Sequence, residues 1–437
     1  MPDTVGCAKV GFDHSARSGG PGLGSRPIIL VAALRTANQF LFTTFEALLS
    51  SYGIKEPSFR AIICEKRNPA FACSALKASR SYSFCENACG AGSQVTRPTT
   101  SKHSKGNIMS SHDRSLYLRY AEALSHPSDF SGAIAAFFSA DANINVVHPF
   151  NEIQGANKYL NKFLRPLQKS FEGLYRRNDI FMAGQFEGQD WISSTGYYVG
   201  RFAQDWIGIK ATGTLSYLRY GEFHRIENGS AVESYIYLDI PELMIACNQW
   251  PLPMGPGLSR GYTGLIQGPA SRDGVIMNAT DPAEGQRSYQ IVTDMLSELA
   301  TEDEAWRPYW HNNMMWYGPG AFGSFVGIEE FASFQVPFES QFEGWSGGTK
   351  NNGMTKHFAR YGDGNYTCSG GWPSLTGVNV KPFLGQGPTN KRVFMRVCDW
   401  WRREDSLLVE NWVFVDVPHV LLQLGFDPLP DWPRGQN

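Results

Sequence analysis

The main body of this sequence has little net charge and lacks the basic excess typical of proteins that bind nucleic acid. The 437 residues carry a formal net charge of −2. Residues 1–108 hold 13 Lys and Arg against 6 Asp and Glu, which leaves 26 against 35 for the rest of the chain. A mildly acidic body argues against nucleic acid as a partner. The apolar stretch from Pro27 to Leu34 is too short to span a bilayer, so we expect no membrane partner either.

Cysteine is sparse outside the N-terminal region. Five of the eight cysteines lie within residues 1–108. Cys85 and Cys89 have the spacing of half a zinc site, but the other cysteines form no second pair at a ligand spacing. We therefore expect no metal site and no disulfide framework. The few cysteines of the main body suit a reducing, cytoplasmic location.

Residues 1–108 also differ in texture from the rest of the chain. They are rich in Gly, Ser and Ala, hold few acids and show no sustained hydrophobic period. One interpretation is an organelle transit peptide. Another is that Met109, which precedes a helix-like run, is the true start of the protein. We expect residues 1–108 to be disordered or a non-native extension.

The main body contains an internal similarity at a separation of 177 residues. The run Val232–Pro241 (VESYIYLDIP) matches Val409–Pro418 (VENWVFVDVP) without a gap. Farther upstream, Tyr217–Phe223 matches Phe394–Trp400 at the same offset. Self-similarity at a fixed offset indicates a repeated structural unit. The sequence therefore predicts two copies of one domain.

The order of predicted elements is the same in both copies. Amphipathic helices over Ser115–Leu124 and Tyr289–Leu299 open the two copies, and most of the remaining elements are strands. Helices followed by a run of antiparallel strands favour an α+β fold with the helices on one face of the sheet. We predict domains at 109–250 and 287–430, joined by a Pro- and Gly-rich linker at 251–286.

The last strand of each copy separates two kinds of side chain. Because side chains alternate between faces along a strand, one face is aromatic and flanked by carboxylates, and the other is largely aliphatic. A solvated face would carry Lys, Thr or Gln, so we expect both faces to be covered. We assign the aromatic face to a pocket and the aliphatic face to packing between the domains. The predicted pocket residues are Glu410, Trp412, Phe414 and Asp416 in the second copy and Glu233, Tyr235, Tyr237 and Asp239 in the first.

Three segments of the second copy resemble a known family. The segments Trp310–Glu330, Gly362–Tyr366 and Glu410–Gly425 look like the SnoaL-like polyketide cyclases of the nuclear transport factor 2-like (NTF2-like) superfamily. The resemblance is good across 288–428 and weaker across 112–250. It implies that each domain is a cone-shaped barrel, with helices closing a curved antiparallel sheet over an apolar pocket. Typical members are single domains that pair as homodimers, so two tandem copies imply an intramolecular pseudo-dimer.

The resemblance also implies cofactor-free chemistry on a small hydrophobic carbonyl compound, an aldol-type cyclisation in polyketide metabolism. Removing a proton beside a carbonyl needs a base within hydrogen-bond reach. Burial in an aromatic pocket raises the pKa of a carboxyl group toward the working range. Asp416 matches the family's aspartate near the end of the last strand and is the predicted base. Its alternative role is to cap the helix that follows.

Weaker candidates complete the predicted site. His357 and Asp363 fall in the middle of the second copy, where either can hydrogen-bond an enolate or orient the base. Trp316 and Trp401 are further predicted pocket residues. The run Gly318–Gly323 matches a dinucleotide-binding fingerprint, but the domain lacks alternating β and α units, so a Gly-rich turn is favoured. We therefore expect no cofactor.

Two alternative functions remain open. The same fold can serve as a non-catalytic module that binds a hydrophobic ligand or scaffolds a partner. An epoxide hydrolase or dehydratase-like activity also uses a carboxylate in the same type of cone.

Overall fold

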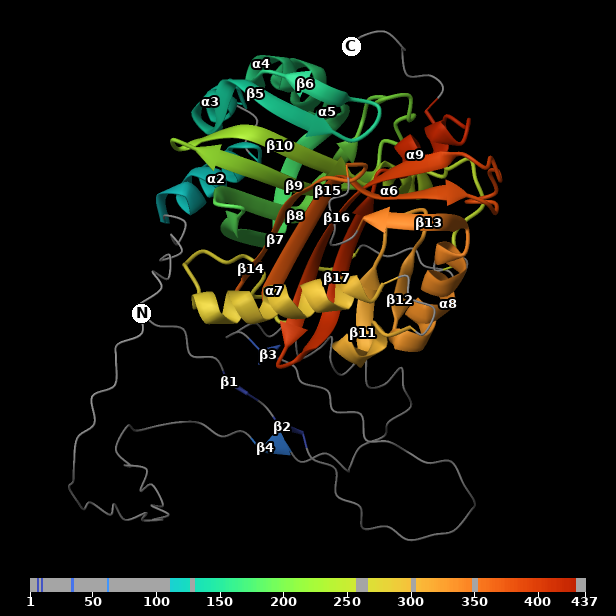
Figure 1. Ribbon diagram of the computed structural model, residues 1–437. Coiled ribbons are helices and arrows are strands. Elements are labelled where there is room, and N and C mark those ends of the chain that lie inside the picture. Colours follow the sequence, from blue (N-terminus) through green and yellow to red (C-terminus); the bar gives the residue numbers. More distant parts are fainter. Residues whose placement is uncertain are drawn as a thin grey trace, which may run out of the picture. The chain divides into compact units, whose positions relative to one another are not determined.

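A computed structural model of the chain describes residues 111–125, 130–256, 266–299, 304–347 and 353–429, and four two-residue strands nearer the N-terminus (Figure 1). The chain divides into two compact units at residue 99. We call residues 111–256 the first half and residues 266–429 the second half of the larger unit.

The smaller unit contributes only short strands to this description. β1 pairs with β3 and β2 pairs with β4, all antiparallel. The strands are β1 (Gly6–Cys7), β2 (Lys9–Val10), β3 (Ala33–Leu34) and β4 (Ala61–Ile62). The predicted disorder or non-native origin of residues 1–108 otherwise lies outside the described residues.

The first half builds one mixed sheet with the strand order β6-β5-β10-β9-β8-β7, in which β5 runs parallel to β10. Its strands are β5 (Phe138–Val146), β6 (Asn151–Gln154), β7 (Phe171–Phe186), β8 (Gln189–Phe202), β9 (Leu215–Glu227) and β10 (Ser230–Leu238). Its helices are α2 (Ser111–Ala123), α3 (Phe130–Phe137), α4 (Ala156–Tyr159), the π-helix η2 (Leu160–Leu164), α5 (Arg165–Ser170) and α6 (Ile240–Ala246).

The second half builds a second mixed sheet with the order β12-β11-β17-β16-β15-β13, and β14 also pairs with β15. Its strands are β11 (Trp310–Tyr317), β12 (Ser324–Val326), β13 (Phe342–Gly347), β14 (His357–Asp363), β15 (Tyr366–Asn379), β16 (Arg392–Glu404) and β17 (Leu407–Val415). Its helices are α7 (Pro282–Ser297), η4 (Arg307–Tyr309), α8 (Ile328–Glu339) and α9 (Val417–Gln423).

The predicted α+β class is confirmed, but both sheets are mixed rather than antiparallel. β5 lies beside β10 in the first sheet, and β11 lies beside β17 in the second. Both of these pairs run parallel. Helix α7 begins where the sequence has a capping residue before a proline, because the Asp281 side chain accepts from the Ala283 N–H and Pro282 opens the helix. Figure 1 shows α7 lying across strands β14–β17 of the second sheet.

The two sheets contact each other through aromatic faces. Trp400 on β16 points toward the first sheet, and its Nε1 donates to Ser193 Oγ at 3.2 Å. A Cβ atom at Gly221 would lie 2.8 Å from the Trp400 ring, so a glycine is needed for this approach. The rings of Tyr235 and Phe358 stack with their centroids 3.7 Å apart. Burial of these large rings stabilises the contact between the halves.

A buried Arg–Asp pair of the first half reaches into the second half. Arg219 Nη2 lies 2.8 Å from Asp239 Oδ2. The same carboxylate accepts from the backbone N–H of Gly320 at 2.9 Å, and the guanidinium donates to the carbonyl of Val413 at 2.8 Å. We call this pair, Arg219–Asp239, the first clasp.

A second Arg–Asp pair makes the reciprocal connection. Arg396 Nη1 lies 2.9 Å from Asp416 Oδ2, and this oxygen also accepts from the backbone N–H of His148 at 3.0 Å. Arg396 donates in addition to Asn151 Oδ1 at 3.0 Å. In both pairs the arginine and the aspartate are 20 residues apart in the chain. We call the pair Arg396–Asp416 the second clasp.

Removing the second clasp is expected to destabilise the fold. In Asp416→Ala, the half-buried Arg396 loses its ion-pair partner and two backbone N–H groups lose their acceptor. We expect the free energy of unfolding to fall by about 3 kcal/mol in urea denaturation. The exposed Asp141→Ala is the control and should change it by less than about 0.5 kcal/mol. An equal, small effect of both substitutions would contradict the clasp.

Candidate functional site

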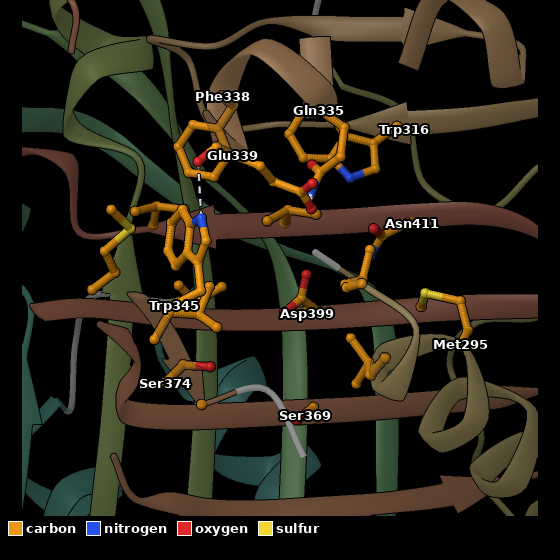
Figure 2. Close-up of a pocket in the computed structure, with 18 of the residues that line it drawn as sticks. Met295, Trp316, Gln335, Phe338, Glu339, Trp345, Ser369, Ser374, Asp399 and Asn411 are labelled. Atoms are coloured by element: carbon orange, nitrogen blue, oxygen red, sulfur yellow. Dashed lines mark hydrogen bonds between the residues drawn. The ribbon is translucent and has the colours of Figure 1, made fainter. Parts of the chain in front are cut away.

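A cavity of about 330 Å³ lies in the second half, between the second sheet and helices α7 and α8 (Figure 2). Its walls are largely aromatic, and no Lys or Arg occurs among the described residues that line it. The aromatic lining residues are Trp310, Trp316, Phe322, Phe331, Phe334, Phe338, Trp345 and Trp401. Such a cavity suits an uncharged and mostly apolar ligand.

The sheet side of the cavity carries a row of side chains in register. Arg360 on β14 pairs with Ser369 on β15, Ser369 pairs with Asp399 on β16, and Asp399 pairs with Val413 on β17. Directly opposed residues on neighbouring strands share a face, with Cβ atoms about 5 Å apart. Ser369, Asp399 and Val413 all line the cavity. Figure 2 shows Asp399 and Ser369 on this side of the cavity.

Asp399 has the electrostatic character of an acid–base group. Burial raises the pKa of its carboxyl to about 8, although a hydrogen bond with Asn411 and the positive charge of Arg360 act in the opposite direction. Asn411 also lines the cavity, and its Nδ2 donates to the carbonyl of Trp400 at 3.1 Å. A carboxyl with a pKa in this range can both accept and return a proton near neutral pH.

His357 also lines the cavity, but its ring nitrogens are engaged within the protein. Arg360 Nη2 lies 3.4 Å from Nδ1, and Nε2 lies 3.2 Å from the carbonyl oxygen of Ser374. A guanidinium only donates and a carbonyl only accepts, so the proton of the neutral ring is on Nε2. Burial, and then the charge of Arg360, lower the pKa of His357 to about 4. His357 is therefore neutral at physiological pH and orients Arg360.

The two faces of β17 are exchanged relative to the sequence-based expectation. The face that lines the cavity holds Asn411, Val413 and Val415, and the aromatic face packs on the other side of the sheet. There, Glu410 pairs with Arg402 at 2.5 Å and Trp412 Nε1 donates to the carbonyl of Gln267 at 2.8 Å. The ring of Phe414 lies under the Arg219 guanidinium at 4.2 Å. The physical reason is that α8 supplies an aromatic wall to the cavity and α7 an aliphatic one, while the aromatic face of the sheet is buried against the first half.

Asp416 and Asp363 are not among the described residues that line the cavity. Besides forming the second clasp, Asp416 caps α9, because its Oδ1 accepts from the His419 N–H at 3.2 Å. Asp363 pairs with Arg114 of the first half at 2.9 Å and accepts from the Ala183 N–H at 3.0 Å. Both carboxylates therefore connect the halves.

The predicted pocket residues of the first half also have partners outside this cavity. Glu233 pairs with Arg225 at 2.9 Å, and Asp239 belongs to the first clasp. Tyr235 stacks on the second sheet, and Tyr237 donates its hydroxyl to a backbone carbonyl of that sheet at 3.0 Å. Of the other predicted residues, Trp316 and Trp401 line the cavity.

Glu222 stands in the first sheet at the position that matches Asp399 at the 177-residue offset. Its side chain is fully buried, ion-paired with Arg176, and accepts from the Tyr117 hydroxyl at 2.5 Å. Burial alone would raise the pKa of Glu222, but Arg176 and then His224 lower it to about 2. This carboxylate is therefore permanently ionised and paired, in contrast to Asp399.

Sequence reasoning missed Asp399, Ser369 and Arg360. Asp399 had one detectable signal. It is the only acid in the run Val393–Trp401, and it shares a face of β16 with Val397 and Trp401. Ser369 and Arg360 had no signal of their own, because their roles follow from the register between β14, β15 and β16.

No group of three or more His, Cys, Asp or Glu side chains that could hold a metal ion occurs among the described residues. Within the same part of the chain, no helix combines the length and apolar character needed to cross a membrane.

Comparisons with known proteins find similarity at the level of structure. No protein-family model and no curated protein matches the chain. A candidate SnoaL-like polyketide cyclase from Jannaschia sp. CCS1 is 13% identical, with a TM-score of 0.28, and covers 33% of this chain and 97% of that chain. IdmH from Streptomyces antibioticus, a candidate polyketide cyclase, is 14% identical, with a TM-score of 0.26 and coverage of 31% and 97%.

An NTF2-like protein from Burkholderia thailandensis E264 is 18% identical, with a TM-score of 0.25, and covers 31% of this chain and 97% of that chain. These three structures are SnoaL-like or NTF2-like proteins or polyketide cyclase candidates, and each is about a third of this chain in length. At these identities and TM-scores they assign no activity to it.

The raised pKa of Asp399 predicts a pH-dependent loss of stability. The carboxyl has an ordinary pKa of 3.8 and a folded-state pKa of about 8. Between these values unfolding releases a proton, so stability falls as the pH rises from about 4 to about 8. Asp399→Asn cannot ionise, so we expect its melting temperature to rise relative to the parent between about pH 5 and pH 8.5.

Thermal melts of the parent, Asp399→Asn and the exposed control Asp141→Asn over this range provide the test. The control should follow the parent at every pH. Parallel curves for Asp399→Asn and the parent would show that Asp399 titrates normally.

Proposed function

We propose that the second half is an enzyme site that removes a proton beside a carbonyl group of a small, uncharged, largely aromatic compound, with Asp399 as the base. The observation that carries this proposal is a carboxyl of raised pKa facing an aromatic cavity. A base with a pKa near the working pH is both partly ionised and strongly basic. Aromatic side chains form much of the wall of the cavity that it faces.

The reaction follows from the chemistry of a carboxylate beside a carbonyl compound. Ionised Asp399 takes a proton from the carbon next to the carbonyl. The electron pair of the C–H bond forms a C=C bond, and the π pair of the carbonyl moves to its oxygen to give an enolate. The enolate carbon then either takes the proton back from Asp399 or attacks a second carbonyl of the same molecule, whose oxygen takes up the π pair and then the proton from Asp399. The first outcome is exchange or isomerisation, and the second is an aldol-type ring closure. The similarity of residues 288–428 to SnoaL-like cyclases supports the second outcome.

Asp399 takes the role that the sequence assigned to Asp416. The Asp416 carboxylate already binds Arg396 and two backbone N–H groups, and it points toward the first half. The oxygens of this carboxylate are engaged within the protein, and Asp416 is not among the described residues that line the cavity. We therefore keep the reaction predicted for the family but assign it to the neighbouring strand.

We also propose that residues 109–250 and 287–430 are duplicated domains that pair as an intramolecular pseudo-dimer. The reciprocal clasps support this proposal, because Arg219 and Asp239 match Arg396 and Asp416 at the 177-residue offset. The pairing surfaces are the aromatic faces of the sheets. The first domain, with Glu222 held by Arg176, then serves as the partner that covers the aromatic face of the second.

Exchange of the α-proton into deuterated buffer, followed by NMR, tests the proposed reaction. With a panel of neutral aromatic β-ketoesters and aryl ketones, we expect the full-length parent to catalyse exchange at a rate that rises with pH through about 8. Asp399→Asn should lose about 100-fold or more, since acid–base catalysis contributes this much. The control Asp141→Asn should retain the parental rate.

Two results would contradict the proposal. Exchange that survives in Asp399→Asn would exclude this residue as the base. Tight binding of several compounds without exchange would favour the hydrophobic-ligand module, with epoxide hydrolysis and dehydration as the next reactions to assay.

A further inference from the structure

We propose that Ser369, polarised by Arg360, is the hydrogen-bond donor that binds the carbonyl oxygen of the ligand beside Asp399. This inference rests on the proposed function and adds the group that stabilises the enolate oxygen. It also narrows the ligand to a neutral aromatic molecule whose enolisable carbonyl lies at the sheet side of the cavity.

The register places Ser369 between a cation and the proposed base. Arg360 and Asp399 are its direct partners on the two neighbouring strands. The Arg360 Nε–H donates to Ser369 Oγ at 3.2 Å in a buried hydrogen bond. Because guanidinium N–H groups only donate, the serine oxygen is the acceptor and its own O–H proton must be directed elsewhere. Ser369 lines the cavity, so that proton can reach a ligand oxygen.

Proton transfer to Asp399 would favour this hydrogen bond. Before the transfer, the ligand oxygen is an uncharged carbonyl oxygen and a modest acceptor. When Asp399 takes the proton from the ligand, the ligand oxygen gains negative charge and becomes a stronger acceptor for the Ser369 hydroxyl. The hydrogen bond therefore strengthens in the transition state, which is the condition for a catalytic contribution.

Arg360 increases the strength of this donor. It is 5% exposed and is not among the described lining residues, so its charge acts on the cavity through Ser369. A hydroxyl that accepts from a cation is a stronger donor. The position of Arg360 is fixed by His357 on its own strand and by the close packing of α7 on β14. A Cβ atom at Gly362 would lie only 1.9 Å from the carbonyl oxygen of Gly285 on α7.

The same arrangement excludes anionic ligands. The ionisable acids that line the cavity are Asp399 and Glu339, and the described lining has no cation to pair with a carboxylate or phosphate. Arg360 is shielded behind Ser369. A free carboxylic acid, a phosphate ester or a coenzyme A thioester would therefore lose its hydration without a compensating charge. A neutral ketone or ester requires only the single donor that Ser369 supplies.

Binding of phenols that mimic the enolate tests the inference without requiring turnover. We would measure the Kd of a series of naphthols of similar shape and graded acidity for the full-length parent, Ser369→Ala, Ser369→Thr and Ser374→Ala. Ser374 is the matched control, since it lines the cavity and uses only its backbone carbonyl to bind His357. Affinity in the parent should rise with naphthol acidity, because a more acidic naphthol gives its proton to ionised Asp399 more completely. The oxygen then carries more negative charge and accepts a stronger hydrogen bond from Ser369.

In Ser369→Ala we expect the Kd for the most acidic naphthol to rise about 10-fold and the dependence of Kd on naphthol acidity to flatten. Ser369→Thr, which keeps the hydroxyl, should retain that dependence, and Ser374→Ala should stay within about twofold of the parent. Arg360→Met should flatten the dependence of Kd on naphthol acidity as Ser369→Ala does. The double variant of Arg360→Met and Ser369→Ala should show no larger effect, as expected when Arg360 acts through Ser369.

The outcomes for the two proposals are distinguishable. An unchanged dependence in Ser369→Ala, or no naphthol binding by the parent, overturns this inference whatever the exchange assay shows. A parent that binds naphthols as expected but exchanges no α-proton overturns the proposed reaction and leaves Ser369 as the oxygen-binding group of a ligand site. If Ser369→Ala melts more than about 10 °C below the parent, Ser369→Thr and Arg360→Met decide the test. A flattened dependence of Kd on naphthol acidity in Ser369→Thr also overturns the inference.

Discussion

The alternation of side chains along β16 and β17 determines which of their residues face the cavity and which face the first half. Consecutive residues of β16 have different surroundings, because Trp400 is buried against the first sheet while Asp399 and Trp401 line the cavity. The sheet can expose neither face to water without a large loss of apolar burial. The first half covers one face and helices α7 and α8 cover the other. The cavity lies between this sheet and helices α7 and α8, and Asp399, the one acid of Val393–Trp401, faces it.

The two clasps account for the aspartates that directly follow the last strand of each half. Asp239 and Asp416 each pair with an arginine of the preceding strand and accept a backbone N–H of the opposite half. Each interaction satisfies a buried charge and also fixes the relative position of the two sheets. Glu222 and Asp399 also match at the 177-residue offset, but their surroundings differ. Arg176 neutralises Glu222, whereas Arg360 lies on the far side of Ser369 from Asp399 in the strand register.

Much of the architecture could be predicted from the sequence. The 177-residue similarity and the α+β class follow from local patterns. The sequence-based prediction started α7 at Tyr289, whereas Asp281 caps the helix and Pro282 opens it, within the segment predicted as a linker. The pattern on β17 also identified which side chains share a face. It could not determine which face meets the helices, because that depends on packing between segments more than 100 residues apart. Trp412 and Phe414 are as compatible with a pocket wall as with a buried contact between sheets.

The site itself depends still more on long-range structure. An aspartate before Val-Pro suits both a base and a helix cap, and only the positions of Arg396 and His148 distinguish the two roles. Ser369 acquires its proposed role from strand register alone. His357 was identified by its type, but burial and then Arg360, a neighbour that the sequence did not single out, lower its pKa and keep it neutral.

The most direct test of this account is a crystal structure of the full-length protein with a bound naphthol. The account predicts the ring among the aromatic side chains of the second half and its oxygen within hydrogen-bond distance of Ser369 and Asp399. A ligand bound beside Asp416, between the two sheets, or in the first half beside Glu222 would contradict it.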